Sequence, residues 1–198
     1  FTINAIAMSY AWKLTDAYRG FEDLKKKKIR TIGNPKIRFT ESPLRMLIAI
    51  RFISELGFNL ESKTGRVLKQ KSKLLANLEI SEMIDEIRRI LQGKFFKKAL
   101  KVMVSSGVYK RIPVLKYEFK RLANAFRPVS IDTILASSFI QNKDFSESWA
   151  PLCQNPERVR TVVELALAQP KGKYNPKDLF NYGLDICLEA NRINNMLK

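Results

Sequence analysis

The sequence contains no histidine, and this absence excludes several kinds of active site. Histidine is the usual general base near neutral pH and the commonest metal ligand, and Ser–His and Cys–His nucleophile pairs depend on it. Cysteine is also scarce: Cys153 and Cys187 are far apart, and neither belongs to a C-x-x-C pair. We therefore predict neither a disulfide framework nor a zinc site, and we expect both thiols to be buried and inert.

Long apolar runs are missing as well. No stretch approaches the ~20 apolar residues that a membrane-spanning helix needs, and no charged start, apolar run and small-residue cleavage site mark a signal peptide. We expect a cytoplasmic protein without a membrane partner. The first residue is Phe1 rather than methionine, which favours a piece of a longer protein. Nothing in the sequence indicates an oligomeric state.

Acidic residues are few compared with basic ones. Lysine and arginine together number 36, against 19 aspartates and glutamates, so the net charge is +17 and the isoelectric point is about 10.0. An excess of this size is typical of proteins that bind polyanions, and nucleic acid is the leading partner class. Two alternatives stay open: the lysines keep a cytosolic protein soluble, or they contact an anionic membrane surface.

The acidic residues that are present do not form a recognisable metal site. Phosphoryl transfer with two metal ions commonly uses two carboxylates on alternate positions of a strand, and the sequence has no D-x-D or D-x-E in a strand-like segment. Glu82, Asp85 and Glu86 share one predicted helix, where we expect a solvated face paired with Arg88 and Arg89. Phosphate-binding motifs of the P-loop and Rossmann types are absent too. We predict no catalytic residue and no metal ligand within this chain.

The apolar pattern predicts a mainly α fold with a small mixed α/β region at its start. Residues 1–33 contain a predicted helix over 2–10 and predicted strands over 13–18 and 28–32. The pattern becomes purely helical near Asn34-Pro35, which is the best boundary candidate. After it, short connections that contain glycine and proline separate the helices.

The clearest helix lies between residues 40 and 57. Its apolar residues recur every three or four positions, and Gly57 follows them as a C-cap. Thr40 or Ser42 can cap its start, and Pro43 is tolerated in the first turn. Further helices are predicted over 63–77, 81–91, 95–105, 116–125, 130–141, 145–152, 156–168 and 176–197.

Four segments of the first third carry a family resemblance, and their order makes it specific. They are Phe1 to Ala5, which match the end of an R-R-D-F-T-x-N-A motif; Asp16, Gly20, Asp23 and Leu24, which match D-x-x-x-G-x-x-D-L; Ile29 to Pro35; and Arg38 to Phe58, which include a stretch similar to R-F-x-E-D-x-x-R. Together they resemble the bacterial-type CCA-adding tRNA nucleotidyltransferases, which are related to the poly(A) polymerases.

The resemblance implies a chain with three parts. It implies an α/β remnant of a nucleotidyltransferase head over 1–33, an irregular helical neck over 34–105 that selects the base, and an irregular helical body over 106–198 that binds tRNA. Within a full-length enzyme, the chain would help to add C and A to tRNA 3′ ends from CTP and ATP. Mg²⁺ would be bound by head-domain carboxylates upstream of Phe1, so we expect this chain alone to be inactive. The implied partners are the nucleoside triphosphates and the acceptor arm of tRNA.

The same resemblance implies that Asn4, Asp16, Glu41, Ser42 and Arg45 bind the nucleotide. Cytosine and adenine both present an exocyclic amine beside a ring nitrogen, so one acceptor and one donor can read both bases. In the family an aspartate and an arginine at positions i and i+3 of the neck helix take these roles, and here the positions hold Ser42 and Arg45. Ser42 departs from the family's aspartate, and a neutral hydroxyl forms weaker hydrogen bonds than a carboxylate.

Basic residues after the neck helix are the candidates for holding RNA through its backbone and shape. These candidates are Lys94, Lys97, Lys98, Lys101, Lys110, Arg111, Lys116, Lys120 and Arg121. The aromatic residues between them have helical spacing, which favours core positions over a stacking platform. The run from Lys25 to Lys28 is either a solvated helix end or a phosphate contact.

Other functions are compatible with the same residues. Two more departures from the family pattern are Ile48, where an arginine is usual, and Ser81-Glu82, where Glu-Arg is common. One alternative is therefore a non-catalytic, basic helical RNA-binding module, such as a degenerate paralogue. A poly(A) polymerase and a CC- or A-adding variant are nearer alternatives.

Overall fold

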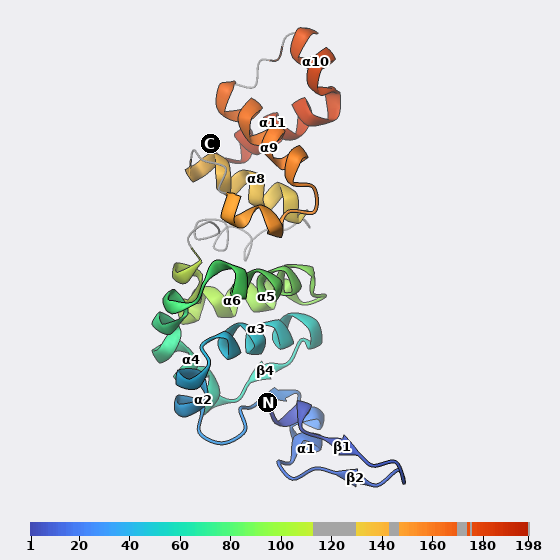
Figure 1. Cartoon of the computed structure of the whole chain (residues 1–198), viewed down its shortest axis with the longest axis vertical. Coiled ribbons are helices and arrows are strands. Elements are labelled where there is room, and N and C mark those ends of the chain that lie inside the picture. The colour runs from blue at the N-terminus through green and yellow to red at the C-terminus, as the bar shows by residue number, and fades with distance from the viewer. Residues whose placement is uncertain (113–129, 143–146, 170–173, 175, 198) are drawn as a thin grey trace. The chain divides into compact units, whose positions relative to one another are not determined.

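A computed structural model describes residues 1–112, 130–142, 147–169, 174 and 176–197 of the chain. The contacts divide the chain into two units, Phe1–Ile112 and Pro113–Lys198. The fold is mainly helical with short strands near the N-terminus, as the sequence predicts (Figure 1). The predicted helix over 116–125 lies outside the described residues, as does the start of the one over 145–152. The three-part division at 33 and 105 stays a prediction.

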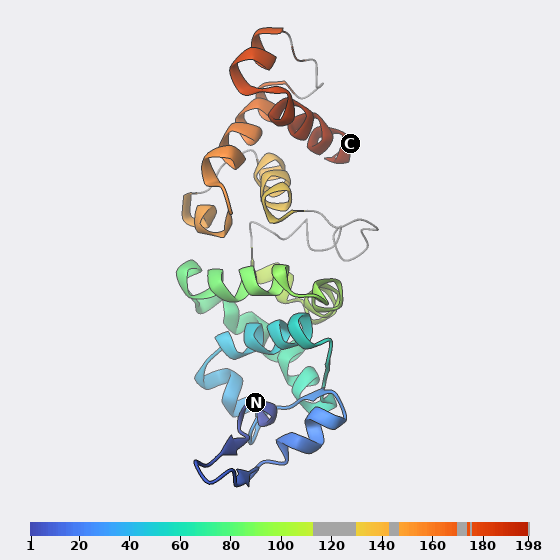
Figure 2. The ribbon, with the colours of Figure 1, turned by 90° about the vertical axis from the view of Figure 1, so that its right-hand side faces the viewer.

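The first thirty residues form a hairpin and a short helix. A 3₁₀ turn η1 (Thr2–Asn4) leads into the antiparallel strands β1 (Ala7–Met8) and β2 (Leu14–Thr15), followed by α1 (Gly20–Lys25) and β3 (Lys28–Ile29). The hairpin projects away from the helices of its unit in both views (Figures 1 and 2). The predicted helix over 2–10 is therefore wrong, because its amides bond across the chain: Thr2 N–H donates to the Arg30 carbonyl oxygen and Ser9 N–H to that of Lys13.

A buried carboxylate joins these elements. Asp23 is 4% exposed and accepts hydrogen bonds from Thr2 Oγ1 at 2.8 Å and from Arg30 Nε at 3.0 Å. Strand β3 then pairs in parallel with β4 (Asn59–Leu60), which the sequence pattern missed. Together these contacts fix η1 and the segment after β3 against the helices of the unit.

The rest of the first unit packs around one central helix, α3 (Leu44–Leu56). The other elements are α2 (Pro35–Glu41), α4 (Ser62–Lys71), η2 (Ser72–Asn77), α5 (Ile80–Gln92), α6 (Phe96–Ser106) and η3 (Val108–Arg111). Helix α3 contacts α5 and α6 on one side and β3 and β4 on the other (Figure 1). Leu47, Ile50 and Ile53 of α3 are fully buried. Gly57, with φ of 71°, ends α3 as predicted.

The helix predicted from Thr40 onward is interrupted at Ser42 and Pro43. Helix α2 ends at Glu41, and Ser42 has φ of −147° and ψ of 98°. A residue before proline avoids the α conformation because the proline ring clashes with it. No side chain caps the start of α3, so the predicted capping role of Thr40 or Ser42 is wrong. The single helix predicted over 63–77 likewise divides into α4 and the 3₁₀ helix η2.

The second unit is also helical. It contains α8 (Ile131–Asn142), η5 (Glu147–Leu152), α9 (Pro156–Ala168), α10 (Pro176–Tyr182) and α11 (Leu184–Leu197). Arg158 of α9 donates to Asp185 at 2.7 Å and to Glu189 at 2.9 Å, which ties α9 to α11. The helix predicted over 176–197 is broken at Gly183, where φ is 81°. No helix in the described part of the chain is both long and apolar enough to cross a bilayer.

Both cysteines are buried, as predicted. Burial raises the pKa of the Cys153 thiol to about 12, and it also raises the pKa of Cys187. A thiolate is the reactive form of cysteine. The two thiols are therefore poor nucleophiles at neutral pH.

Candidate functional site

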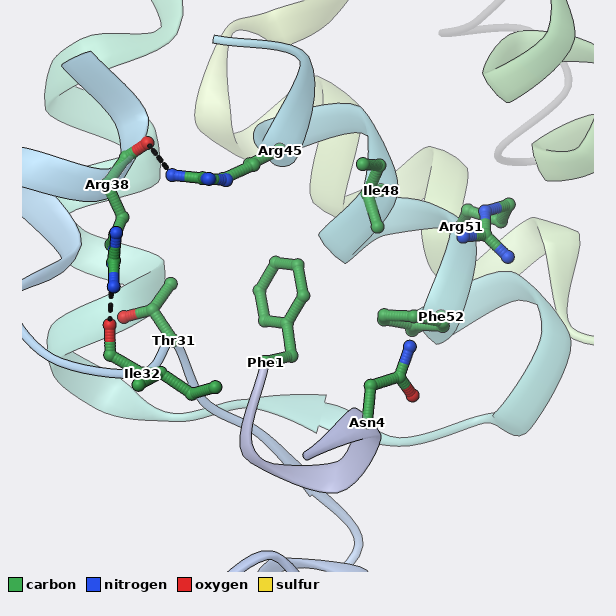
Figure 3. Close-up of a pocket in the computed structure, with 9 residues that line it drawn as sticks. All are labelled: Phe1, Asn4, Thr31, Ile32, Arg38, Arg45, Ile48, Arg51 and Phe52. Atoms are coloured by element: carbon green, nitrogen blue, oxygen red, sulfur yellow. Dashed lines mark hydrogen bonds between the residues drawn. The ribbon is translucent and has the colours of Figure 1, made fainter. Parts of the chain in front are cut away.

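A pocket of about 400 Å³ opens where η1, the segment after β3, α2 and α3 meet (Figure 3). Pockets for small ligands usually begin at about this size. The lining residues are Phe1, Asn4, Thr31, Ile32, Arg38, Arg45, Ile48, Arg51 and Phe52. Residues separated by fifty positions thus share one cavity.

Two arginines on one side of the pocket are held by the same carboxylate. Glu41 Oε2 accepts from Nη1 of Arg38 and from Nη1 of Arg45, both at 3.0 Å. Nη1 of Arg45 also donates to the Arg38 carbonyl oxygen at 3.2 Å, and Nε of Arg38 donates to that of Ile32 at 3.2 Å (Figure 3). No described residue accepts a hydrogen bond from Nη2 of Arg45, so an oriented donor is available to a ligand.

The carboxylate of Glu41 keeps its negative charge near neutral pH. Hydrogen bonds from Arg38 first, and then from Arg45, lower the pKa of Glu41 below its usual range. Glu41 is therefore ionised whenever the pocket is used at neutral pH. Its carboxylate keeps the Arg45 guanidinium in one orientation.

The other side of the pocket is apolar and aromatic. Phe1 and Phe52 pack edge to face with ring centroids 5.5 Å apart, and Figure 3 shows the Phe1 ring in the middle of the cavity near Ile48. Arg51 is bound elsewhere, because its Nε donates to Glu86 at 2.7 Å and its Nη1 to Glu55 at 3.0 Å. Its guanidinium lies 4.7 Å from the Phe52 ring and supports that wall. The pocket can therefore hold a flat, partly polar group against aromatic rings.

One polar atom of the pocket lacks a partner within the described structure. Thr31 is 5% exposed, and its Oγ1 is buried without a hydrogen bond. Buried hydroxyls in native proteins almost always have partners, and each exception needs an explanation. A polar atom of a bound ligand would satisfy Thr31, as it would the exposed amide of Asn4 in the same pocket.

The five predicted nucleotide-binding residues do not all meet in this pocket. Asn4 and Arg45 line it, and Glu41 stands behind Arg45. Ser42 is not among the lining residues, because the break before Pro43 takes it out of α3, although its carbonyl oxygen accepts from Arg45 N–H at 3.2 Å. Asp16 accepts from the Gly20 and Phe21 amides at 2.7 and 2.8 Å and thus caps α1. The Phe21 bond is the largest cause of a lowered pKa at Asp16.

Several residues of the pocket were not predicted as site residues. Thr31, Ile32 and Phe52 carry no charge, and although they lie in segments that carry the resemblance, nothing in the sequence marks them as ligand contacts rather than packing residues. Arg38 is different, since it stands four residues before Ser42 in the motif that carries the resemblance. Two arginines flanking one glutamate at spacings of three and four were a signal that could have found it.

The predicted RNA-binding residues within the described part lie on α6, on η3 and on the turn before α6. Lys94, Lys101 and Lys110 are exposed, whereas Lys97 and Arg111 are half-buried. Lys98 is already engaged, because its Nζ donates to the Gly57 carbonyl oxygen at 2.6 Å and so binds the end of α3. Lys116, Lys120 and Arg121 lie outside the described residues.

The acidic residues of α5 have mixed roles. Asp85 pairs with Arg88 at 2.8 Å, as predicted for a solvated face. Glu86 instead binds Arg51 of α3, and Glu82 forms a capping box with Glu79. Across the described residues, no group of three or more His, Cys, Asp or Glu side chains could hold a metal ion. These residues therefore do not fit Mg²⁺.

Comparisons with known proteins agree on one group of enzymes. Residues 57–119 match the family model described as the probable RNA and SrmB-binding site of polymerase A. The chain is 32% identical over 211 residues to the CCA-adding enzyme of Geobacillus sp. (strain WCH70), an alignment that covers 98% of this chain and 50% of that enzyme.

Solved structures show the same likeness. The Bacillus stearothermophilus CCA-adding enzyme in complex with CTP matches with a TM-score of 0.74 and 27% identity, over 100% of this chain and 52% of that one. The Thermotoga maritima CCA-adding enzyme complexed with tRNA shares the fold, with a TM-score of 0.61 and 22% identity, over 100% of this chain and 58% of that one. The chain spans about half the length of these relatives.

Proposed function

Because the chain belongs to the family of bacterial CCA-adding enzymes, we propose that it supplies the base-binding pocket and part of the tRNA-binding surface of a nucleotidyltransferase. The complete enzyme would add C and A to tRNA 3′ ends from CTP and ATP. The observation that carries the proposal is the Arg45 guanidinium, which Glu41 and the Arg38 carbonyl oxygen hold at the wall of a pocket of suitable size.

The chemistry of the pocket suits a nucleobase. A base is flat, with polar atoms on its edge and π faces on either side. Arg45 can donate to a ring nitrogen of cytosine or adenine, while Phe52 and its neighbours offer an aromatic surface. The unpaired Thr31 hydroxyl and the Asn4 amide can bond to remaining polar atoms of the nucleotide. The solved relative from Bacillus stearothermophilus is itself in complex with CTP.

The role of this chain would be positioning rather than bond making. Mg²⁺ in such an enzyme would supply charge stabilisation for the transferring phosphoryl group. The described residues offer no site for it, so no step of the transfer is assigned to them. They would hold the incoming base at a fixed place, and alignment of reacting groups is itself a large part of catalysis.

The tRNA-binding part of the proposal depends on charge. Lys94, Lys101 and Lys110 are exposed on or beside α6, within the residues that match the RNA-binding family model. Between Glu86 and Glu118 the sequence has no acidic residue that could neutralise them. Contacts of this type bind the RNA backbone without reading its sequence.

Binding of nucleotides and tRNA to the 198-residue chain tests the proposal directly. We expect CTP and ATP to bind and to compete with each other, and tRNA to bind independently of them. Isothermal titration calorimetry with each ligand measures this. A chain that binds tRNA but neither nucleotide would instead support the alternative, a non-catalytic RNA-binding module. Ile48 in the pocket wall favours this alternative, because the family usually has an arginine at that position.

A nucleotide-incorporation assay separates the chain's role from that of a complete enzyme. We expect no incorporation by this polypeptide alone, with CTP, ATP and Mg²⁺ present, because the described residues provide no metal site. Robust incorporation would overturn the assignment of catalysis to residues outside this chain.

A further inference from the structure

One helix outside the pocket carries a dense excess of positive charge. Between Glu61 and Glu79 the sequence contains five basic residues and no acidic one. They belong to α4 and to η2, which continues from it. None of them was among the RNA-binding residues that the sequence predicted. They are Lys63, Arg66, Lys69, Lys71 and Lys73.

Four of these residues form a continuous stripe, which we call the α4 stripe. Its members are Lys63, Arg66, Lys69 and Lys73, and all four are exposed. Positions three or four residues apart are neighbours on a helix surface, so the charges follow one side. The opposite side of α4 is buried through Val67 and Leu68. Helix α4 is therefore anchored by its buried side, and the charged side chains of the stripe face the solvent.

The α4 stripe differs from the arginines around the pocket in having no carboxylate partner among the described residues. Arg30, Arg45 and Arg51 each bond to an aspartate or glutamate at 3.0 Å or less. None of the four stripe residues forms an ion pair with any residue that the structure describes. Like charges on adjacent helical turns repel each other and destabilise the helix. An anionic partner would remove that repulsion.

Helix α4, which carries most of the stripe, packs against α2, whose Arg38 lines the pocket. A groove of about 590 Å³ separates α2 from α4, and Lys36, Lys71 and Glu41 are among its lining residues. Glu41 is also the residue whose carboxylate accepts a hydrogen bond from Arg45 at 3.0 Å. Helix α4 also packs against α6, which carries Lys97 and Lys101 of the predicted RNA-binding residues. An RNA bound along α4 would thus pass close to α2 and to α6.

We propose that the α4 stripe binds the phosphate backbone of the tRNA and is a second RNA-contact surface beside that of α6 and η3. This rests on the proposed function and extends it to particular residues, since the family model matched over residues 57–119 describes RNA binding for the segment as a whole. RNA fits better than an anionic membrane, because a membrane-surface helix presents large apolar residues beside its basic face. In α4 and η2, no large hydrophobic side chain is exposed.

The test removes the four charges together, in the variant Lys63→Gln/Arg66→Gln/Lys69→Gln/Lys73→Gln of the 198-residue chain. We expect binding of fluorescently labelled tRNA to weaken at least about tenfold, and the slope of log affinity against log salt to fall by about three, since each phosphate contact contributes about 0.7 to 0.9. CTP affinity should not change. Circular dichroism establishes that the variant is folded.

Two matched variants identify the cause of any loss. Lys13→Gln/Arg89→Gln/Lys177→Gln/Arg192→Gln removes four exposed charges that are scattered over the chain. If the stripe variant binds tRNA as well as this scattered variant does, the α4 stripe is not an RNA site.

The variant Lys94→Gln/Lys97→Gln/Lys101→Gln/Lys110→Gln tests the proposed function separately. Weaker binding in this variant alone would overturn the stripe and leave the proposed function standing.

A membrane partner is a distinct outcome. Wild-type and stripe variants are also mixed with phosphatidylserine vesicles. Loss of vesicle binding without loss of tRNA binding would overturn the RNA assignment in favour of an anionic lipid surface. Failure of wild-type chain to bind tRNA at all would overturn the RNA-binding part of the proposed function as well.

Discussion

The basic residues of α2 and α3 and those of α4 carry the same charge but are held in opposite ways. Arg38 and Arg45 share one carboxylate, and both also donate to backbone carbonyl oxygens. The lysines and arginine of the α4 stripe have no such partner among the described residues. A guanidinium in a fixed orientation can distinguish one hydrogen-bonding edge from another. Mobile charges on an exposed helix suit a polyanion whose sequence does not matter.

Salt gives the largest expected difference between the two regions. Raising the salt concentration from about 50 to about 200 mM should weaken tRNA binding by about a hundredfold or more, because several phosphate contacts release counterions. CTP binding should weaken far less, since it depends on a few hydrogen bonds within one pocket rather than on many phosphate contacts. Fluorescence anisotropy for tRNA and calorimetry for CTP measure the two slopes. Equal slopes would remove the contrast between the regions.

Arg45→Ala should abolish most nucleotide binding. A hydrogen bond from a charged donor contributes about 1.5 to 3 kcal/mol, so we expect CTP and ATP affinity to fall about ten- to hundredfold. Binding of tRNA should be unchanged. Arg66→Ala on the α4 stripe removes the same charge and is the matched control. A loss of CTP affinity in Arg66→Ala as large as in Arg45→Ala would show that general charge, rather than a held guanidinium, binds the nucleotide.

The sequence predicts the helices well where apolar residues recur without interruption. Helix α3 and its end at Gly57 follow from such a pattern, as do α9 and most of α5 and α6. It fails where the backbone bonds to distant segments. The predicted strands over 13–18 and 28–32 contain β2 and β3, but their partners β1 and β4 were not predicted, because the pairing depends on contacts outside each strand.

The candidate site was predictable only in part for the same reason. Asn4, Glu41 and Arg45 stand in recognisable motifs, and the fold brings them to one pocket or just behind it. Thr31 and Phe52 join it because β3 pairs with β4 and because Asp23 ties the first turn to Arg30. The position of Ser42 was mistaken because the effect of Pro43 on the preceding residue outweighed its helical surroundings.

Glu41→Gln should have a smaller effect than Arg45→Ala. The amide keeps the size of the side chain but removes the charge that holds both arginines, so Arg45 becomes less ordered. We expect CTP affinity to fall about three- to tenfold, in the range of one neutral hydrogen bond or less. Affinity for tRNA should not fall. Calorimetry on Glu41→Gln and on Glu61→Gln, which changes a carboxylate that caps α4 instead, makes the measurement. Equal effects in the two variants would contradict the positioning role of Glu41.

Ser42→Asp should sharpen the selectivity of the pocket, with the smallest change in affinity. Ser42 lies outside α3, but its carbonyl oxygen bonds to the Arg45 amide, so its side chain is next to the start of the helix that carries the guanidinium. A carboxylate there could accept from the exocyclic amine of cytosine or adenine, and it would repel the carbonyl oxygen that uracil and guanine present at the same place.

The preference of Ser42→Asp for CTP and ATP over UTP and GTP should therefore rise severalfold, or about 1 kcal/mol, which is the size of one hydrogen bond. Competition of the four nucleotides for the chain measures the preference. Ser42→Asn has the size of the aspartate variant without its charge, and we expect it to change the preference less. If neither variant alters the order of the four nucleotides, residue 42 does not contact the base. The held arginine would then be the only reader of the base edge on this side of the pocket among the residues that the structure describes, and a lone donor cannot tell these bases apart as well as a donor and an acceptor together.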